Sequence, residues 1–433
     1  MKHIAFISSS LVLIAMAACQ APDQRDVTSD VKFDSALATL MDFEFDGTVQ
    51  ADSVFNNEQL IRDQLLYTIG HLNEQKSVGR LDALVLSNVI RTALPNGTGF
   101  AVTYHAKLPV AWGSKTNLPS SYQFTLPKNM GYEGQQAFTN KYNPSCVEAG
   151  AHDVSTGSMW YYYRPGKGSC RIDSADVVKA TATTVRSQLN SDGKYPEYDL
   201  IWERDDNALK VVAIFGKFED GTTTSADAGI AGYESFISGL GRLTGLANTH
   251  FTTTDNAFSS PGDGNHTSET IMTATKNGKA VEVVAMLVDN VRTTNQAFKQ
   301  RYNQKSTDAD VIMYNGHAGL GDNVRALARR GNFKAGKYLL VFMNGCDTFA
   351  YVDGSLAQTR AVLNPNDPTG TKFMDIITNA MPSYFNSMPY ASLALIQGLL
   401  EREQPKTFKQ MFNNIDRVEV VLVTGEEDNS FHP

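Results

Sequence analysis

The chain has 433 residues, of which 42% are hydrophobic and 19% are charged, and its formal net charge is −8. This length exceeds the usual size of one domain, so two domains are expected. No basic stretch provides the electrostatic footprint of a nucleic-acid-binding protein, which argues against nucleic acid as a partner.

The first 18 residues have the features of an export signal. Lys2 and His3 precede an apolar core over residues 4–16, which is too short for a stable membrane span. We therefore expect residues 1–18 to be a signal peptide. The polar residues 19–30 are expected to form a tether to the folded part of the chain.

Cys19 stands where this signal ends, in Met16-Ala17-Ala18-Cys19, which resembles a bacterial lipoprotein signal. The resemblance implies that Cys19 becomes the acylated first residue, so that a lipid anchor attaches the protein to a membrane. Gln20 at the next position favours the outer membrane if the cell is Gram-negative. The alternative is ordinary cleavage at the small-residue site Ala15-Met16-Ala17, which would give a soluble secreted protein.

The chain has four cysteines, which divide into one lipid site, one pair and one remainder. Cys146 and Cys170 lie in a segment rich in proline and glycine. This setting predicts a disulfide that staples a loop in an oxidising compartment. Cys346 is the remainder, and we expect it to carry a thiol that is either buried and inert or reactive.

Residues 31–205 are expected to form an α+β domain in which no catalytic constellation is apparent. Its histidines lack metal-ligand spacing, and the aromatic run at 159–163 is assigned to strand packing rather than to sugar or peptide binding. The expected elements are helices over 33–43, 57–72 (with Asn57 as N-cap) and 135–142, a hairpin of strands 81–94 and 100–112 around Pro95-Asn96-Gly97, and strands over 122–126 and 159–163.

Residues 206–433 alternate between strand and helix patterns, which is typical of an α/β fold with a mostly parallel sheet. The acidic segment 425–429 follows the last strand, either as a solvated surface loop or as an attractant for basic substrates near the crevice. The expected strands are 210–215, 270–275, 279–288, 311–314, 338–343 and 418–423, and the expected helices are 229–243, 291–303, 322–330, 372–381 and 391–401.

Two continuous apolar runs in this second domain end in polar turns that carry reactive side chains. Residues 311–314 lead into Asn-Gly-His317-Ala-Gly, and residues 338–343 lead into Asn-Gly-Cys346-Asp-Thr. Such runs are typical of strands buried on both faces of a sheet. If the two strands are parallel neighbours, their carboxyl ends bring His317 and Cys346 to one crevice. An imidazole there can raise the thiolate fraction of a cysteine and so make it a nucleophile.

At these residues the chain resembles the caspase-like (clan CD) cysteine peptidases, which include caspases, legumain, clostripain, gingipains and the CHAT-type proteases. Their signature is an apolar strand that ends in His-Gly and a second apolar strand that ends in a small residue and the nucleophilic Cys. The matching pieces here are Tyr-Asn-Gly-His317-Ala-Gly and Leu-Val-Phe-Met-Asn-Gly-Cys346-Asp-Thr, and the resemblance covers roughly residues 208–400. It implies a caspase-like α/β domain in which Cys346 attacks and His317 handles the proton.

The resemblance also implies an oxyanion site made by backbone N–H groups of the two turns. Gly316 and Gly345 allow a substrate carbonyl to approach the backbone closely. The residue after the histidine is Ala318, where the family usually has Gly, and its N–H is the donor that the family is thought to use.

Two functions are therefore kept open. The first is an envelope-anchored cysteine endopeptidase that acts on peptide or protein substrates and needs no cofactor or metal, since His317 has no second or third ligand at a recognisable spacing. The second is a catalytically inactive caspase-like lipoprotein that serves as a binding or assembly module of the cell envelope. In that case His317 is a structural hydrogen-bonding residue and Cys346 a small buried hydrophobe. Exposure of the Cys346 sulfur discriminates between them.

Overall fold

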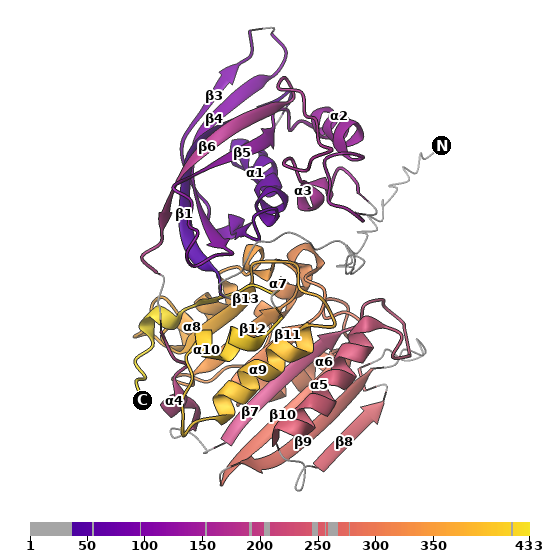
Figure 1. Ribbon diagram of the computed structural model, residues 1–433, viewed down its shortest axis with the longest axis vertical. Coiled ribbons are helices and arrows are strands. Elements are labelled where there is room, and N and C mark those ends of the chain that lie inside the picture. The colour runs from indigo at the N-terminus through magenta and orange to yellow at the C-terminus, as the bar shows by residue number, and fades with distance from the viewer. Residues whose placement is uncertain are drawn as a thin grey trace, which may run out of the picture.

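The computed structural model shows a mixed α/β protein with two β-sheets, one of six strands and one of eight (Figure 1). The predicted signal peptide, the tether and the domain boundary at 205 all lie outside the described residues. The structure describes residues 37–53, 56–95, 97–151, 154–189, 193–202, 208–244, 250–255, 257–258, 267–276, 278–416 and 419–433.

The six-stranded sheet is antiparallel, with the order β2-β4-β1-β6-β5 and with β3 also paired to β4. Helix α1 packs against this sheet, as Figure 1 shows in indigo and violet. The elements are β1 (Thr39–Ala51), α1 (Asn57–Asn73), β2 (Val78–Gly79), β3 (Val85–Ala93), β4 (Phe100–Trp112), β5 (Ser121–Pro127), α2 (Tyr132–Tyr142), α3 (Met159–Tyr162) and β6 (Val177–Arg186).

Three predictions in this half are wrong. The helix expected over 33–43 is instead the start of β1, where acidic residues at every second position face outward and apolar residues face inward, a period of two rather than 3.6. Residues 33–36 lie outside the described part. The aromatic run expected as a strand forms helix α3, and all four of its residues are buried, which supports the packing role. Helix α1 is confirmed, but its N-cap is Asn56, whose side chain accepts from two backbone N–H groups.

The eight-stranded sheet has the order β14-β13-β12-β11-β7-β10-β9-β8. Strands β10, β7, β11, β12 and β13 run parallel to one another. Strand β14 is antiparallel to β13, β9 is antiparallel to β10, and β8 is antiparallel to β9. The strands are β7 (Ala208–Gly216), β8 (His250–Asp255), β9 (Ser268–Lys276), β10 (Lys279–Val288), β11 (Val311–Asn315), β12 (Leu339–Asn344), β13 (Met374–Asn379) and β14 (Val421–Thr424).

Helices cover both faces of this sheet. One apolar core joins the sheet to α4 (Tyr198–Trp202), α5 (Ala228–Thr244), α9 (Met388–Leu400) and α10 (Phe408–Met411). The core on the other face includes α6 (Gln296–Ser306), α7 (Asp322–Ala328) and α8 (Ser355–Leu363) and is continuous with the core of the six-stranded sheet. Short 3-10 helices lie at Leu81–Ala83, Gly319–Gly321, Thr348–Ala350, Phe412–Asn414 and Glu426–Asp428. None of the described helices is both long and apolar enough to cross a membrane.

Two further predictions are corrected in this half. The helix expected over 372–381 is strand β13, and its only charged residue, Asp375, is accommodated by hydrogen bonds from Tyr338 and Asn429. The acidic segment 425–429 does not lie near the crevice. Because β14 is antiparallel, with Thr424 opposite Ile376, this segment lies at the amino ends of the parallel strands.

Candidate active site

His317 and Cys346 follow two adjacent parallel strands at the same edge of the sheet. Asn315, the last residue of β11, pairs with Asn344, the last residue of β12. The N–H of Gly316 then donates to the carbonyl of Asn344 at 3.2 Å, so the register continues into the two turns. The expected adjacency of the strands is confirmed, and it places the histidine and cysteine turns side by side.

The two turns touch through backbone rather than side chains. A Cβ atom on Gly345 would lie 2.6 Å from the carbonyl oxygen of Gly316, so a larger residue there would push the turns apart. The same position is 3.5 Å from the amide nitrogen of Ala318. Ala318 has φ −66° and ψ −26°, a conformation that any residue adopts, so alanine is accommodated without strain. Because the Gly316 N–H is occupied by Asn344, the N–H groups of Ala318 and Gly345 remain as candidates for an oxyanion site.

The imidazole of His317 is held in one orientation. Its Nε2 atom donates to the carbonyl oxygen of Phe218 at 2.9 Å, and since a carbonyl only accepts, Nε2 carries the proton. Nδ1 is buried and has no hydrogen-bond partner among the described residues. Burial is the main cause that lowers the pKa of His317 below its ordinary value. A neutral ring with an unused lone pair on Nδ1 is the form that a general base requires.

Cys346 is buried, with 4% of its surface exposed, and its sulfur lies 3.5 Å from the carbonyl oxygen of Ser383. It is disulfide-bonded, and no described cysteine is free. A lipid on the sulfur of Cys19 would leave Cys346 no other cysteine of this chain to pair with, because the chain has four cysteines and Cys146 pairs with Cys170. In such a lipidated form Cys346 would carry the expected thiol.

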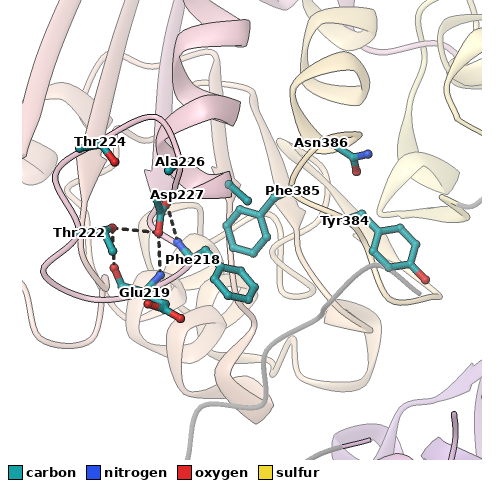
Figure 2. Close-up of a pocket in the computed structure, with 10 residues that line it drawn as sticks. Phe218, Glu219, Thr222, Thr224, Ala226, Asp227, Tyr384, Phe385 and Asn386 are labelled. Carbon is teal, nitrogen blue, oxygen red and sulfur yellow. Dashed lines mark hydrogen bonds between the residues drawn. The ribbon is translucent and has the colours of Figure 1, made fainter. Parts of the chain in front are cut away.

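A pocket of about 650 Å³ opens beside the histidine. Two loops line it: residues 218–228 after β7, and residues 384–386 after β13 (Figure 2). The rings of Phe218 and Phe385 lie 5.5 Å apart and each contacts the ring of His317, at 5.3 and 4.8 Å between centroids. The pocket therefore shares its aromatic wall with the surroundings of the imidazole.

The buried charge in this pocket is already satisfied. Oδ1 of Asp227 accepts from the N–H groups of Phe218, Gly229 and Ile230, and its Oδ2 accepts from Glu219 N–H and the Thr222 hydroxyl (Figure 2). Asp227 thereby closes the loop onto the first turn of α5. Both oxygens of its carboxylate are therefore occupied by hydrogen bonds within the protein and are not available to a ligand.

Three asparagines at the ends of neighbouring strands form a row of side-chain hydrogen bonds next to the two turns. Asn344 Nδ2 donates to Asn315 Oδ1 at 3.0 Å, and Asn379 Nδ2 donates to Asn344 Oδ1 at 3.2 Å. The sequence analysis missed this row, although a signal was present, because each of the three parallel strands β11, β12 and β13 ends in Asn. It also missed Phe218, which contributes through a backbone carbonyl that no sequence pattern reveals.

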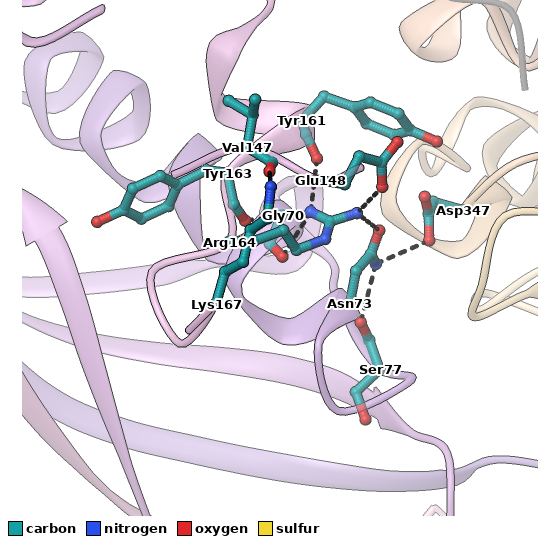
Figure 3. Close-up of polar contacts among 10 residues, drawn as sticks. All are labelled: Gly70, Asn73, Ser77, Val147, Glu148, Tyr161, Tyr163, Arg164, Lys167 and Asp347. Carbon is teal, nitrogen blue, oxygen red and sulfur yellow. Dashed lines mark hydrogen bonds and ion pairs between the residues drawn. The ribbon is translucent and has the colours of Figure 1, made fainter. Parts of the chain in front are cut away.

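The six-stranded module reaches the residue next to the cysteine (Figure 3). Asp347 is completely buried, and its Oδ1 accepts from Nδ2 of Asn73, the last residue of α1, at 3.0 Å. Arg164 in turn donates to Asn73 Oδ1 at 3.4 Å and to Glu148 at 2.5 Å. Burial raises the pKa of Asp347 to about 7. The two modules thus meet through polar groups directly beside Cys346.

The predicted Cys146–Cys170 disulfide is confirmed. It closes the loop that carries Glu148 and Arg164, so it staples the segment that reaches toward Asp347. Cys19 lies outside the described residues.

No group of three or more His, Cys, Asp or Glu side chains within the described ranges is arranged to hold a metal ion. Comparison with known proteins adds no assignment: no family model matches the chain, and the search of curated proteins gives no significant match.

Proposed function

We propose that this chain is a caspase-like cysteine endopeptidase, exported and anchored to the cell envelope by lipid on Cys19. The observation that carries the proposal is the arrangement of His317. Its ring is fixed by Phe218, its Nδ1 lone pair is unused, and it stands at the end of the strand next to the one that delivers Cys346. A nucleophile and its general base must lie close together, and the ends of two neighbouring parallel strands provide such positions.

The proposed reaction begins with Cys346 as a free thiol, which is its state in the proposed lipoprotein, because lipid occupies the Cys19 sulfur and Cys146 is paired with Cys170. The Cys346 thiol gives its proton to Nδ1 of His317, and the thiolate attacks the carbonyl carbon of a peptide bond. The N–H groups of Ala318 and Gly345 stabilise the oxyanion. The protonated His317 then donates to the leaving amine as the C–N bond breaks. Water hydrolyses the thioester and restores the thiol, with His317 acting again as base.

We assign the pocket of Figure 2 to the side chain that precedes the cleaved bond. Its walls are largely aromatic or aliphatic, with Phe218, Tyr384 and Phe385 among them. Asp227 is saturated by internal donors, so Glu219, which is exposed, is the lining carboxylate that can meet a ligand. The aromatic walls favour a large side chain before the cleaved bond, either apolar or with a positive charge that reaches Glu219.

The alternative, an inactive binding or assembly module of the envelope, is favoured by one observation. Exposure of the Cys346 sulfur is the property that separates the two functions, and Cys346 is buried, as expected of a structural cysteine. A peptidase must expose this sulfur to its substrate, whereas a binding module has no need to.

A peptide with an electrophilic carbonyl warhead and a large apolar residue before it separates these functions. The folded wild type is treated with the peptide in the presence of a thiol reductant, and the labelled residue is identified by mass spectrometry. We expect labelling of Cys346, and slower labelling in His317→Ala than in the half-buried control His105→Ala. A folded, reduced protein in which Cys346 does not react would favour the binding module.

A further inference from the structure

The loop over residues 383–387 touches both parts of the candidate site. Tyr384, Phe385 and Asn386 line the pocket, while the carbonyl oxygen of Ser383 lies 3.5 Å from the sulfur of Cys346. A shift of this loop therefore changes the pocket and the surroundings of the sulfur together.

One side chain holds both ends of this loop. Oε1 of Glu419, in the segment just before β14, accepts from the hydroxyl of Ser383 at 2.8 Å and from the hydroxyl of Ser387 at 2.6 Å. Glu419 is completely buried, so water does not compete for these hydrogen bonds. Both serines are also buried. The pocket residues 384–386 therefore lie between two serines that both donate to Oε1 of Glu419, which fixes this segment at both ends.

This clamp continues toward the cysteine turn. The Ser383 hydroxyl also lies 3.1 Å from Asn344 Oδ1, and Asn344 Nδ2 donates to the carbonyl of Met388, the first residue of α9. Asn344 precedes Cys346 by two residues in the chain. Glu419 is thus connected through Ser383 to the strand end that delivers the candidate nucleophile.

Oε2, the second oxygen of the Glu419 carboxyl group, is buried without a hydrogen-bond partner among the described residues. Burial, together with the nearby carboxylate of Asp416, raises the pKa of Glu419 to about 7, while the two serine hydroxyls oppose this shift. An ordinary core position would be filled more favourably by an apolar residue, since a buried carboxyl group is costly.

We propose that Glu419 is a positioning residue that sets substrate binding by clamping the pocket loop through Ser383 and Ser387. This inference rests on the proposed peptidase function. It makes the Glu419 carboxyl group a determinant of the affinity for substrate rather than a participant in bond breaking.

The test compares Glu419→Ala, Glu419→Gln and Ser387→Ala with the wild type and with Glu133→Ala, a control at an exposed position on α2. In Glu419→Gln the side-chain oxygen still accepts from both serines and the unused Oε2 becomes an NH2 group. Glu419→Ala loses both hydrogen bonds. Ser387→Ala loses one and serves if Glu419→Ala does not fold.

The first readout needs no activity. Backbone hydrogen exchange is measured over residues 384–391, with the amides of β11 as an internal reference. We expect Glu419→Ala to speed exchange of this segment by about tenfold and to leave β11 unchanged. Glu419→Gln and Glu133→Ala should match the wild type at pH 6. Unchanged exchange over 384–391 in Glu419→Ala, or in Ser387→Ala if Glu419→Ala does not fold, would overturn the clamp.

The second readout is the kinetics of peptide cleavage by the reduced enzyme. We expect Glu419→Ala to raise KM by about tenfold with a smaller fall in kcat, since lost loop order weakens binding first. Glu419→Gln should restore KM and remove its dependence on pH between 6 and 8. A fall in kcat with unchanged KM would contradict a positioning role. If the wild type cleaves nothing while Glu419→Ala still loosens the loop, the clamp stands and the peptidase proposal fails.

Discussion

The carbonyl oxygen of Phe218 holds the ring of His317 through a 2.9 Å hydrogen bond to Nε2, and so leaves Nδ1 without a proton; Nδ1 is buried and has no hydrogen-bond partner among the described residues. The same backbone segment forms one wall of the substrate pocket. Base orientation and substrate recognition are thereby connected through one residue. Sequence alone does not reveal such a link, because a backbone carbonyl has no sequence signature.

The burial of His317 predicts how catalysis depends on pH. Burial lowers the pKa of His317, so the neutral base persists to lower pH than for an exposed histidine with a pKa near 6.5. We expect the acidic limb of kcat/KM to lie below pH 6.5. Phe385→Ala removes a ring 4.8 Å from the imidazole and admits water, which should move this limb toward higher pH. An acidic limb at or above 6.5 in the wild type would contradict the assignment of His317 as the base.

The Cys146–Cys170 disulfide should stabilise the six-stranded module. Loss of the bond in Cys146→Ser/Cys170→Ser is expected to lower the free energy of unfolding by about 2–4 kcal/mol, because the unfolded chain is no longer constrained. Urea unfolding, followed without reductant, measures this difference. The wild type under reductant is the matched control and should approach the double variant. An unchanged unfolding midpoint would show that the bond contributes little.

Asp347 predicts a pH-dependent loss of stability. Its pKa rises on folding from 3.8 to about 7, so the folded state binds its proton more tightly than the unfolded state. The resulting stabilisation is complete below about pH 4 and is lost as pH rises through 7. We expect Asp347→Asn, which can still accept from Asn73, to lose less stability between pH 5 and 8 than the wild type.

Urea unfolding at the two pH values provides the comparison, with the exposed Asp82→Asn as control. Asp375 and Glu419 also have pKa values raised to about 7 by burial, so some slope should remain in Asp347→Asn. Identical slopes for wild type and Asp347→Asn would mean that Asp347 is not protonated in the folded protein.

The proposed lipid anchor is tested in cells. Growth with a labelled fatty acid should mark the wild type and leave Cys19→Ala unmarked, because the acyl chain needs the cysteine at the end of the signal. Label that persists in the variant would show that Cys19 is not the acylated residue. Fractionation of the same cells gives the membrane of residence, for which Gln20 predicts the outer membrane if the cell is Gram-negative.

The sequence predicted the parallel strands and the adjacency of the two strands that precede His317 and Cys346, because continuous apolar runs that end in glycine turns have few alternative structures. The sequence-based prediction failed where contacts with distant parts of the chain, rather than the local sequence, determine the structure. Strand β13 contains a charged residue, Asp375, whose partners come from distant segments. The clamp at Glu419 could not be predicted either, since its serines lie more than 30 residues away in the chain.

The most direct measurement is cleavage of a mixed peptide library by the reduced, folded wild type and by Cys346→Ala. We expect cleavage by the wild type, concentrated after large residues, and none by Cys346→Ala. Equal cleavage by the wild type and Cys346→Ala, or none by a reduced and folded wild type, would contradict the peptidase proposal and favour the envelope binding module.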